Sequence, residues 1–407
     1  MTNAAQTHAG TDGRYYALDV VRGGALMLGV VLHGGLAYME PRVWIIGDTA
    51  TDPAVNAVFF VIHMFRMSLF FLLAGFFARL LYQKRGAGGF ALDRLKRVAG
   101  PLGIFWFPVL AVIITFLIMG ALKADPSLAS KPPAPPPPLT VDTFPLTHLW
   151  FLYVLLIFYA VFVPLRGLVA FIDRGGSLRR AADTVFRLAL KSGLTGVLFG
   201  LPLFLVILVT PKWLYWFGIA TPDTGLIPNA LALSGYGSAF VAGWLLHRNV
   251  ALLEVVKKQW LGGLISAIGF TFICLWLGRQ GDDAQTIAGS TRPLYAAAYI
   301  LGLWSWCIGL TGLALRFLDR PSAVWRYIAD ASYWVYIVHL PLVLALQYLL
   351  LDMDWPVGAK LWAVIAGTFA LSLLSYQLLV RYSFIGAILS GRKPVRKARA
   401  TFKEKQA

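Results

Sequence analysis

The chain has 407 residues, of which 58% are hydrophobic and only 14% are charged, whereas soluble domains carry roughly 25% charged residues. This composition excludes an ordinary soluble enzyme, and the mean hydropathy of +0.69 agrees. A net charge of +17 would suit a nucleic-acid binder, but the distribution of that charge along the chain excludes nucleic acid as a partner.

Apolar runs long enough to cross a bilayer recur along the chain. A hydrocarbon core of about 30 Å needs roughly 20 mainly apolar residues, and about ten such runs are present. They lie near residues 17–37, 57–81, 99–120, 148–172, 188–209, 228–248, 261–278, 293–316, 328–350 and 357–381. We therefore expect an all-α, polytopic integral membrane protein with one transmembrane domain over residues 17–390, between an N-terminal segment (1–16) and a basic tail (391–407).

Lysine and arginine are concentrated on one side of these predicted spans. If the N-terminus is cytoplasmic, 25 of the 36 basic residues fall in inner segments, 7 in outer segments and 4 within spans. This asymmetry follows the positive-inside rule, so both termini are expected in the cytoplasm. The proline-rich segment 121–147 then becomes a periplasmic loop, either an exposed spacer or the wall of a substrate entrance. The first span lacks the features of a cleaved signal peptide, and we expect it to be retained.

Several other features are explained by the membrane alone. The basic loop at 173–180 and the basic tail suit contact with anionic membrane lipid. Cys274 and Cys307 both lie inside apolar runs, where a small soft side chain commonly packs. We therefore expect neither a disulfide nor a metal site.

The first span contains ionisable residues, which are costly in a bilayer and are therefore functional candidates. Arg22 and His33 are eleven residues apart, so at about 100° per residue they share one helix face, about 16 Å apart in depth. Asp19 lies three residues before Arg22 and can pair with it near the cytoplasmic end. Arg22 is either a snorkelling anchor or a functional group, and His33, in the outer third of the helix, is a candidate for proton transfer.

The second span begins on the outer side and carries His63 and Arg66 on one face. These two side chains suit a polar or anionic ligand, although an interface pair without a ligand is the alternative. Further along, the small residues Ala74 and Gly75 predict the close approach of another helix.

Two more groups of candidates lie at the ends of spans. Arg94 and Arg97, in the inner loop before the third span, suit the phosphates of a soluble cofactor, although the positive-inside rule also explains them. At the outer start of the fourth span His148 is unusual, whereas Trp150 is typical of the aromatic belt at a membrane interface.

The ninth span combines polar side chains with a helix-breaking residue. Ser332, Tyr336 and His339 follow at spacings of four and three, which places them on one helix face. Pro341 lacks a backbone N–H and is expected to open the helix locally. This face is therefore a candidate wall of a site.

In their order along the chain, these segments resemble the motifs of the membrane-bound acyltransferase-3 family. The likeness covers about residues 15–395 and is closest to a branch that succinylates periplasmic glucans. It rests on Leu18–Arg22 followed by His33, Ile62–Met67, Phe70–Gly75, Arg94–Arg97, His148–Leu152, Ala329–Ser332, Tyr333–Pro341 and Leu389–Val395.

The resemblance implies ten spans in the bacterial inner membrane and an acyl-CoA donor, with no tightly bound cofactor. It makes Arg22 and His33 the arginine and histidine of the family's first-helix motif, with Asp19 and His339 as further catalytic candidates. Arg94 and Arg97 resemble the family's basic pair, which with Arg22 would bind acyl-CoA. The residues that would line the acceptor or acyl-group site are His63, Arg66, His148, Trp150 and Tyr336. One departure is Ala74, which stands where the family usually has serine, so we expect no hydroxyl nucleophile there.

Together these patterns predict an O-acyltransferase that moves an acyl group, succinyl or else acetyl, from cytoplasmic acyl-CoA to hydroxyls of a periplasmic glucan or another saccharide. The pantetheine arm would cross the distance between Arg22 and His33, and His33 would act as general base or carry the acyl group itself. A succinyl donor would offer Arg66 a carboxylate. The sequence leaves the acyl group and the acceptor open.

Two functions of other classes compete with this one. A transporter or flippase for a carbohydrate or a lipid-linked saccharide would also carry charges and a proline inside its spans, but the sequence has no inverted repeat of the kind transporters show. A structural subunit of a glucan-export complex would tolerate changes of the intramembrane histidines.

Overall fold

The computed structural model describes residues 15–390 apart from 131–134, 136–137, 280–286 and 288. The N-terminal segment, most of the proline-rich run and the basic tail therefore lie outside the described residues, and the expected domain limits stay predictions. Over the described ranges the chain folds into helices without any β-strand. The predicted all-α class is confirmed.

The α-helices follow one another along the chain as α2 (Tyr16–Gly35), α3 (Pro53–Arg94), α4 (Gly100–Ala124), α5 (Trp150–Ile172), α6 (Ser177–Lys191), α7 (Thr195–Val209), α8 (Ala230–Arg248), α9 (Leu253–Lys258), α10 (Trp260–Gly278), α11 (Thr291–Phe317), α12 (Ala323–Leu350), α13 (Val357–Ser375) and α14 (Phe384–Ser390). The shorter helical segments are η1 (Leu36–Tyr38), η2 (Leu95–Ala99), η3 (Pro126–Ser130), η4 (Thr147–Leu149), η5 (Val250–Leu252) and η6 (Tyr376–Val380). Side-chain caps begin several of the long helices: Asp52 accepts the N–H of Ala54 at 2.9 Å, and Asn229 accepts the N–H of Ala232 at 2.8 Å.

Within the described part of the chain, seven helical segments are long and apolar enough to cross a membrane, and nine if each of two bent helix pairs is one crossing. One segment, Pro53–Ala124, has 72 residues, far more than the roughly 20 that one crossing needs. Its α3 part turns at Gly86, whose φ of 67° suits a residue without a Cβ. The protein is a multi-pass membrane protein, and the expected count of about ten crossings and the cytoplasmic termini stay predictions.

The expected span 188–209 is not one straight helix. α6 and α7 meet at an angle of 106°, so that 188–191 belong to α6 and the apolar helix begins at Thr195. α6 is amphipathic, with Arg179 and Arg187 among its basic residues and Leu178 and Leu188 among its exposed apolar ones. An amphipathic helix of this kind suits the surface of a membrane. The expected span 188–209 therefore joined the last residues of this amphipathic helix to the apolar helix that follows it.

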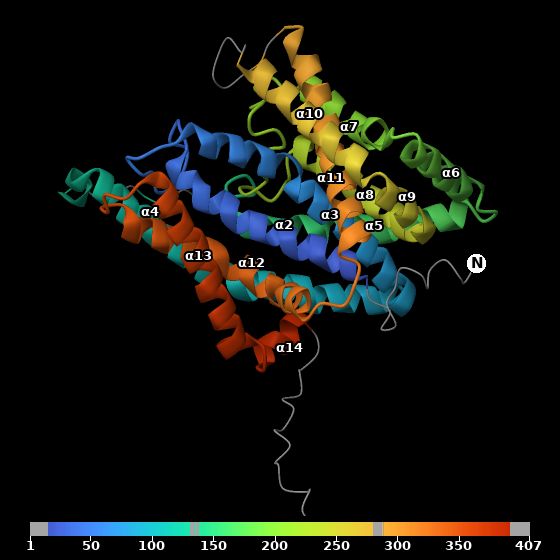
Figure 1. Cartoon of the computed structure of the whole chain (residues 1–407). Coiled ribbons are helices and arrows are strands. Elements are labelled where there is room, and N and C mark those ends of the chain that lie inside the picture. Colours follow the sequence, from blue (N-terminus) through green and yellow to red (C-terminus); the bar gives the residue numbers. More distant parts are fainter. Residues whose placement is uncertain (1–14, 131–134, 136–137, 280–286, 288, 391–407) are drawn as a thin grey trace, which may run out of the picture.

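α2 and α3 lie at the centre of the bundle (Figure 1), with α12 and α13 against one side of α2 and with α8 and α11 against α3. The ionisable residues of the first two spans are therefore not at the lipid boundary. The helices that carry the candidate site residues are the ones that pack on each other.

The crossing of α3 and α8 depends on glycine. A Cβ added at Gly75 would lie 2.0 Å from the carbonyl oxygen of Phe240, and one added at Gly243 would lie 1.8 Å from the carbonyl oxygen of Leu72. The two backbones therefore touch where the sequence predicted a close approach, and that prediction is confirmed.

Replacing Gly75 with alanine is expected to lower the thermal unfolding midpoint of the purified protein. The added methyl group must displace backbone atoms of α8, and overpacking of this kind costs about 1–3 kcal/mol or more. The matched control is Gly269→Ala on α10, where the new Cβ has no atom within 4 Å. Equal unfolding midpoints for the two variants would contradict this prediction and show that the α3–α8 crossing accommodates a methyl group without loss of stability.

Candidate active site

A cavity of 1190 Å³ joins the helices at the centre of the protein. One part of its wall, which we call the basic end, is formed by Arg22, Lys84, Arg94, Arg97 and Arg381. The other part, the histidine end, is formed by His33, His63, Arg66, His148 and His339. Arg22 and His33 both belong to α2 and both line this cavity, which confirms the predicted shared face. Their separation sets the two ends about 16 Å apart along that helix.

The basic end is held together by one buried carboxylate. The side chain of Asp93 is 1% exposed and pairs with Arg85 at 2.8 Å, with Arg94 at 2.5 Å and with Arg97 at 3.3 Å. The guanidinium of Arg94 also lies 5.6 Å from the ring centre of Tyr159. Arg85 does not line the cavity, but the five basic side chains of this end outnumber the acid Asp330, which lines the same cavity. The basic end therefore suits phosphate groups.

Arg22 contributes to the same end from α2. Its guanidinium lies 3.1 Å from the Asp19 carboxylate, and it donates to the carbonyl oxygen of Ala329 at 3.3 Å. The predicted pairing of Asp19 with Arg22 is confirmed. Asp19 itself does not line the cavity, so its place fits orienting Arg22 rather than touching a ligand.

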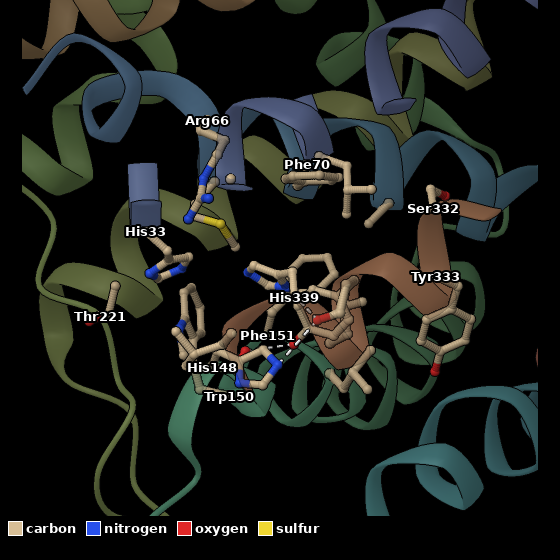
Figure 2. A pocket seen from close by; sticks show the side chains of 18 of the residues that line it. His33, Arg66, Phe70, His148, Trp150, Phe151, Thr221, Ser332, Tyr333 and His339 are labelled. Carbon is tan, nitrogen blue, oxygen red and sulfur yellow. Dashed lines mark hydrogen bonds between the residues drawn. The ribbon is translucent and has the colours of Figure 1, made fainter. Parts of the chain in front are cut away.

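Two histidines face each other at the histidine end. The ring centres of His33 and His339 are 5.2 Å apart, and Figure 2 shows both beside Arg66 and His148. Nδ1 of His339 lies 2.8 Å from the carbonyl oxygen of Tyr336, so Nδ1 carries the proton and donates it to that bond. This fixes the tautomer and leaves the Nε2 lone pair, which no described residue hydrogen-bonds, as a base.

The structure corrects the expected effect of Pro341. α12 stays helical through this residue, although the carbonyl of Ile337 loses its intrahelical donor. The Nε2 of His148 lies 3.1 Å from that oxygen and 3.1 Å from the oxygen of Tyr336. In return the Tyr336 hydroxyl donates to the carbonyl of His148 at 2.6 Å. Thus His148, in η4 just before α5, contacts α12 through the carbonyl that the proline frees.

Arg66 is a buried cation in the cavity wall. It is 8% exposed, and no described carboxylate lies within ion-pair distance of it. Its guanidinium interacts electrostatically with His33 and His339, and it lies so close to α2 that a Cβ at Gly29 would be 2.5 Å from Nη1. A buried charge without a partner is strongly unfavourable, so this site suits an anionic group of a ligand.

The remaining predicted site residues also line the cavity, whereas the cysteines do not. Ser332, Tyr336 and Trp150 line the cavity, and the predicted shared face of Ser332, Tyr336 and His339 is confirmed. Trp150 also packs on Tyr236 with ring centres 5.5 Å apart. The two cysteines are buried and free and lie away from the cavity wall.

Several cavity residues escaped the sequence reasoning. Lys84 falls in a predicted inner segment, where the positive-inside rule explains it, and Arg381 falls within a predicted span. Asp93, an acid inside a basic loop, is the sequence signal for the arginine cluster. The others lie in loops, where no periodic pattern singles them out. They are Trp44, Trp216, Phe217, Thr221 and Asp223. Gln347, deep in α12, does not line the cavity but contacts the helix end that carries His33.

Gln347 uses its whole amide to hold the end of α2. Its Nε2 donates to the carbonyls of His33 at 3.0 Å and Gly34 at 3.1 Å, and its Oε1 accepts the indole N–H of Trp44 at 3.0 Å. Carbonyls at the end of a helix lack intrahelical donors, so this side chain caps the turn that carries His33. The ring of Trp44 in turn lies 5.8 Å from that of His33.

Replacing Gln347 with leucine is expected to lower kcat about 10- to 100-fold with little change in the donor KM, because a small displacement of a reacting group has effects of that size. Steady-state rates of acyl transfer give both constants. Gln259→Leu is the matched control, since the Gln259 amide also donates to a backbone carbonyl, that of Leu190, but away from the cavity. An unchanged kcat in Gln347→Leu would mean that His33 needs no such support.

Comparison with known proteins points in one direction. The model of the acyltransferase domain family, acyltransferase-3, matches residues 15–379. Glucans biosynthesis protein C of Salmonella typhimurium is 24% identical over 396 residues, which is 95% of this chain and 98% of that protein. The protein of the same name from Salmonella typhi is 23% identical over 390 residues, which is 94% of this chain and 96% of that protein. No solved structure matches this chain.

Proposed function

This chain belongs to the acyltransferase-3 family and is a membrane acyltransferase, and we propose that it moves an acyl group from cytoplasmic acyl-CoA to hydroxyls of a saccharide outside the membrane. One observation carries the proposal: a single cavity joins a basic end suited to phosphates to a histidine end suited to proton transfer. The proposed location is the bacterial inner membrane, because such a protein would take its donor from the cytoplasm and its acceptor from the other side.

The donor would bind with its phosphates at the basic end. Arg22, Arg94 and Arg97 are the predicted contacts, and Lys84 and Arg381 line the same part of the wall. Charge-assisted hydrogen bonds from guanidinium groups suit phosphate oxygens. The pantetheine arm then extends through the cavity to bring the thioester to His33, which is about 16 Å away along α2.

The chemistry needs one base and one leaving group. An imidazole Nε2 removes the proton of the acceptor hydroxyl, whose oxygen attacks the thioester carbon. The C–S bond breaks, an ester forms, and the proton returns to the CoA thiolate. In the second form of the step a ring nitrogen of His33 attacks the thioester carbon first, so that the C–S bond breaks, CoA leaves as the thiolate and His33 carries the acyl group. The oriented Nε2 of His339 then deprotonates the acceptor hydroxyl, whose oxygen displaces the His33 nitrogen to form the ester, and the proton passes to the CoA thiolate.

The proposed acyl group is succinyl, with acetyl as the alternative. Arg66 supports succinyl, because the free carboxylate of that group would partner a buried guanidinium that has no described acid beside it. The proposed acceptor is a periplasmic glucan, supported by relatives named glucans biosynthesis protein C. A saccharide transporter or flippase stays the alternative function, since charges inside a membrane also mark transport paths.

The test uses purified protein, a glucan acceptor and radiolabelled succinyl-CoA or acetyl-CoA. Transfer of label to the glucan is expected, with succinyl used faster than acetyl. Movement of glucan across a vesicle membrane without label transfer would identify a carrier instead. Mass spectrometry of periplasmic glucans from cells with and without the gene should show the mass of the same acyl group.

A further inference from the structure

The cavity has a third region that the donor and the histidines leave unused. It is formed by two loops, 39–52 and 210–229, and we call it the loop end. The side chains that line it there are Trp44, Trp216, Phe217, Thr221, Asp223 and Thr224.

The first loop is fixed to the helices beneath it. Asp48 and Lys360 form a buried ion pair at 2.7 Å, with side chains 2% and 3% exposed. Trp44 donates to Gln347 of α12, as described above. Buried pairs of this kind are strongly unfavourable to break, so the loop holds the Trp44 ring in one place.

The second loop is fixed to the segment that leads into α5. The carbonyl of Asp223 accepts the N–H of Thr147 at 3.0 Å, and the N–H of Gly225 donates to the carbonyl of Phe144 at 2.9 Å. Thr147 has a φ of 53°, which is strained for a β-branched residue. Strain of this kind persists where the surroundings enforce it and is concentrated at ligand sites.

Aromatic rings line the way from the loop end to the histidines. The ring centre of Phe217 is 4.2 Å from that of His63, and Trp216 lies 6.1 Å from Phe59, which stacks on His63. On the other loop, 39–52, the ring centre of Trp44 lies 5.8 Å from that of His33 in α2. A ligand in this region meets apolar ring faces next to the reacting groups.

The charge of the loop end is opposite to that of the basic end. The exposed carboxylate of Asp223 forms no ion pair with a described lysine or arginine, and the polar residues Thr221 and Thr224 line the same cavity. A carboxylate accepts hydrogen bonds from hydroxyl groups and repels a second anion. The region therefore suits a ligand with apolar faces and uncharged hydroxyl edges, which describes a sugar ring.

We propose that the loop end is the acceptor subsite and that it binds an uncharged pyranoside. One sugar ring packs against Trp216 and Trp44 and donates a hydroxyl hydrogen bond to Asp223, so that a neighbouring hydroxyl reaches His33 and His339. This inference rests on the proposed acyl transfer and adds the place, the charge and the ring-stacking mode of the acceptor.

The test distinguishes an effect on acceptor binding from an effect on donor binding. In Asp223→Asn and Trp216→Leu the KM for a neutral gluco-oligosaccharide is expected to rise about 10-fold, the value of one hydrogen bond or ring contact of about 1.4 kcal/mol. The donor KM, and the slow hydrolysis of acyl-CoA without acceptor, should stay at wild-type values. The matched controls are Asp142→Asn, in the segment that leads into α5 and outside the cavity wall, and Trp362→Ala, which is 71% exposed on α13.

Acceptor charge gives a second measurement. The wild-type protein should use a neutral gluco-oligosaccharide well and one that carries glucuronate poorly, and Asp223→Asn should reduce that difference. Unchanged acceptor KM in both variants, or equal use of the two acceptors by the wild type, would overturn the subsite while leaving acyl transfer intact. Absence of any label transfer by the wild type would instead overturn the proposed function.

Discussion

Replacing His33 with alanine is expected to abolish acyl transfer while the protein still folds and inserts. The ring of His33 lies in the cavity wall beside His339, and its Nδ1 has no hydrogen-bond partner among the described residues. Proton transfer by a positioned side chain contributes about 10²- to 10⁴-fold to a rate, and loss of an acyl carrier would remove the reaction altogether. The initial rate of label transfer from acyl-CoA to glucan measures the loss.

His247→Ala is the matched control for this experiment. His247 is also a buried histidine within a helix, but it packs on Phe76 away from the cavity, so its variant should keep near wild-type activity. Normal acylation by His33→Ala would remove His33 from the chemistry. The role of His33 is decided by acid quenching of His339→Ala during turnover: an acyl group found on His33 by mass spectrometry means a carrier, and a bare His33 means a general base.

Replacing Arg66 with glutamine is expected to lower kcat/KM for succinyl-CoA by about 30- to 1000-fold, because truncating one partner of a buried, hydrogen-bonded charge pair in a complex costs roughly 2–4 kcal/mol. The acetyl donor has no carboxylate to lose, so its kcat/KM should change much less and the preference for succinyl should disappear. Arg66→Lys keeps the charge without the planar fork and should lie between the two. The measurement is the ratio of kcat/KM for the two donors.

Arg79→Gln provides the control for Arg66. Arg79 is on the same helix, but its guanidinium lies over the ring of Trp244 and outside the cavity wall. That variant should keep the wild-type donor ratio. An equal loss with succinyl and acetyl donors in Arg66→Gln would contradict carboxylate binding and place the guanidinium at the thioester carbonyl.

Helical period explains what the sequence predicted well. The spacings of Arg22 with His33, and of Ser332 with Tyr336 and His339, fix which side chains share a face, and a buried charge in an apolar helix must face the bundle interior. The structure places these groups around one cavity. Gly75 was predictable for a similar reason, because two adjacent small residues let backbones meet.

Features that depend on tertiary contacts were not predictable. The angle between α6 and α7 depends on how the two helices pack in the fold, which hydropathy averaged over a window does not show. At Pro341 the sequence indicated a freed carbonyl, but only the fold brings His148 to it. The loop end has no periodic signal, because Trp44 and Asp223 are 179 positions apart in the chain and meet the same cavity only through the packing of two loops.

The most direct test of the account is acyl transfer across a sealed membrane. Proteoliposomes would hold a neutral glucan inside, with radiolabelled succinyl-CoA added outside and the protein oriented with its basic end outward. Label on the enclosed glucan, with acyl-CoA still excluded from the lumen and with no label in His33→Ala vesicles, is the predicted result. Transfer only when donor and acceptor share one side of the membrane would contradict the account, because the cavity would then not connect the two compartments.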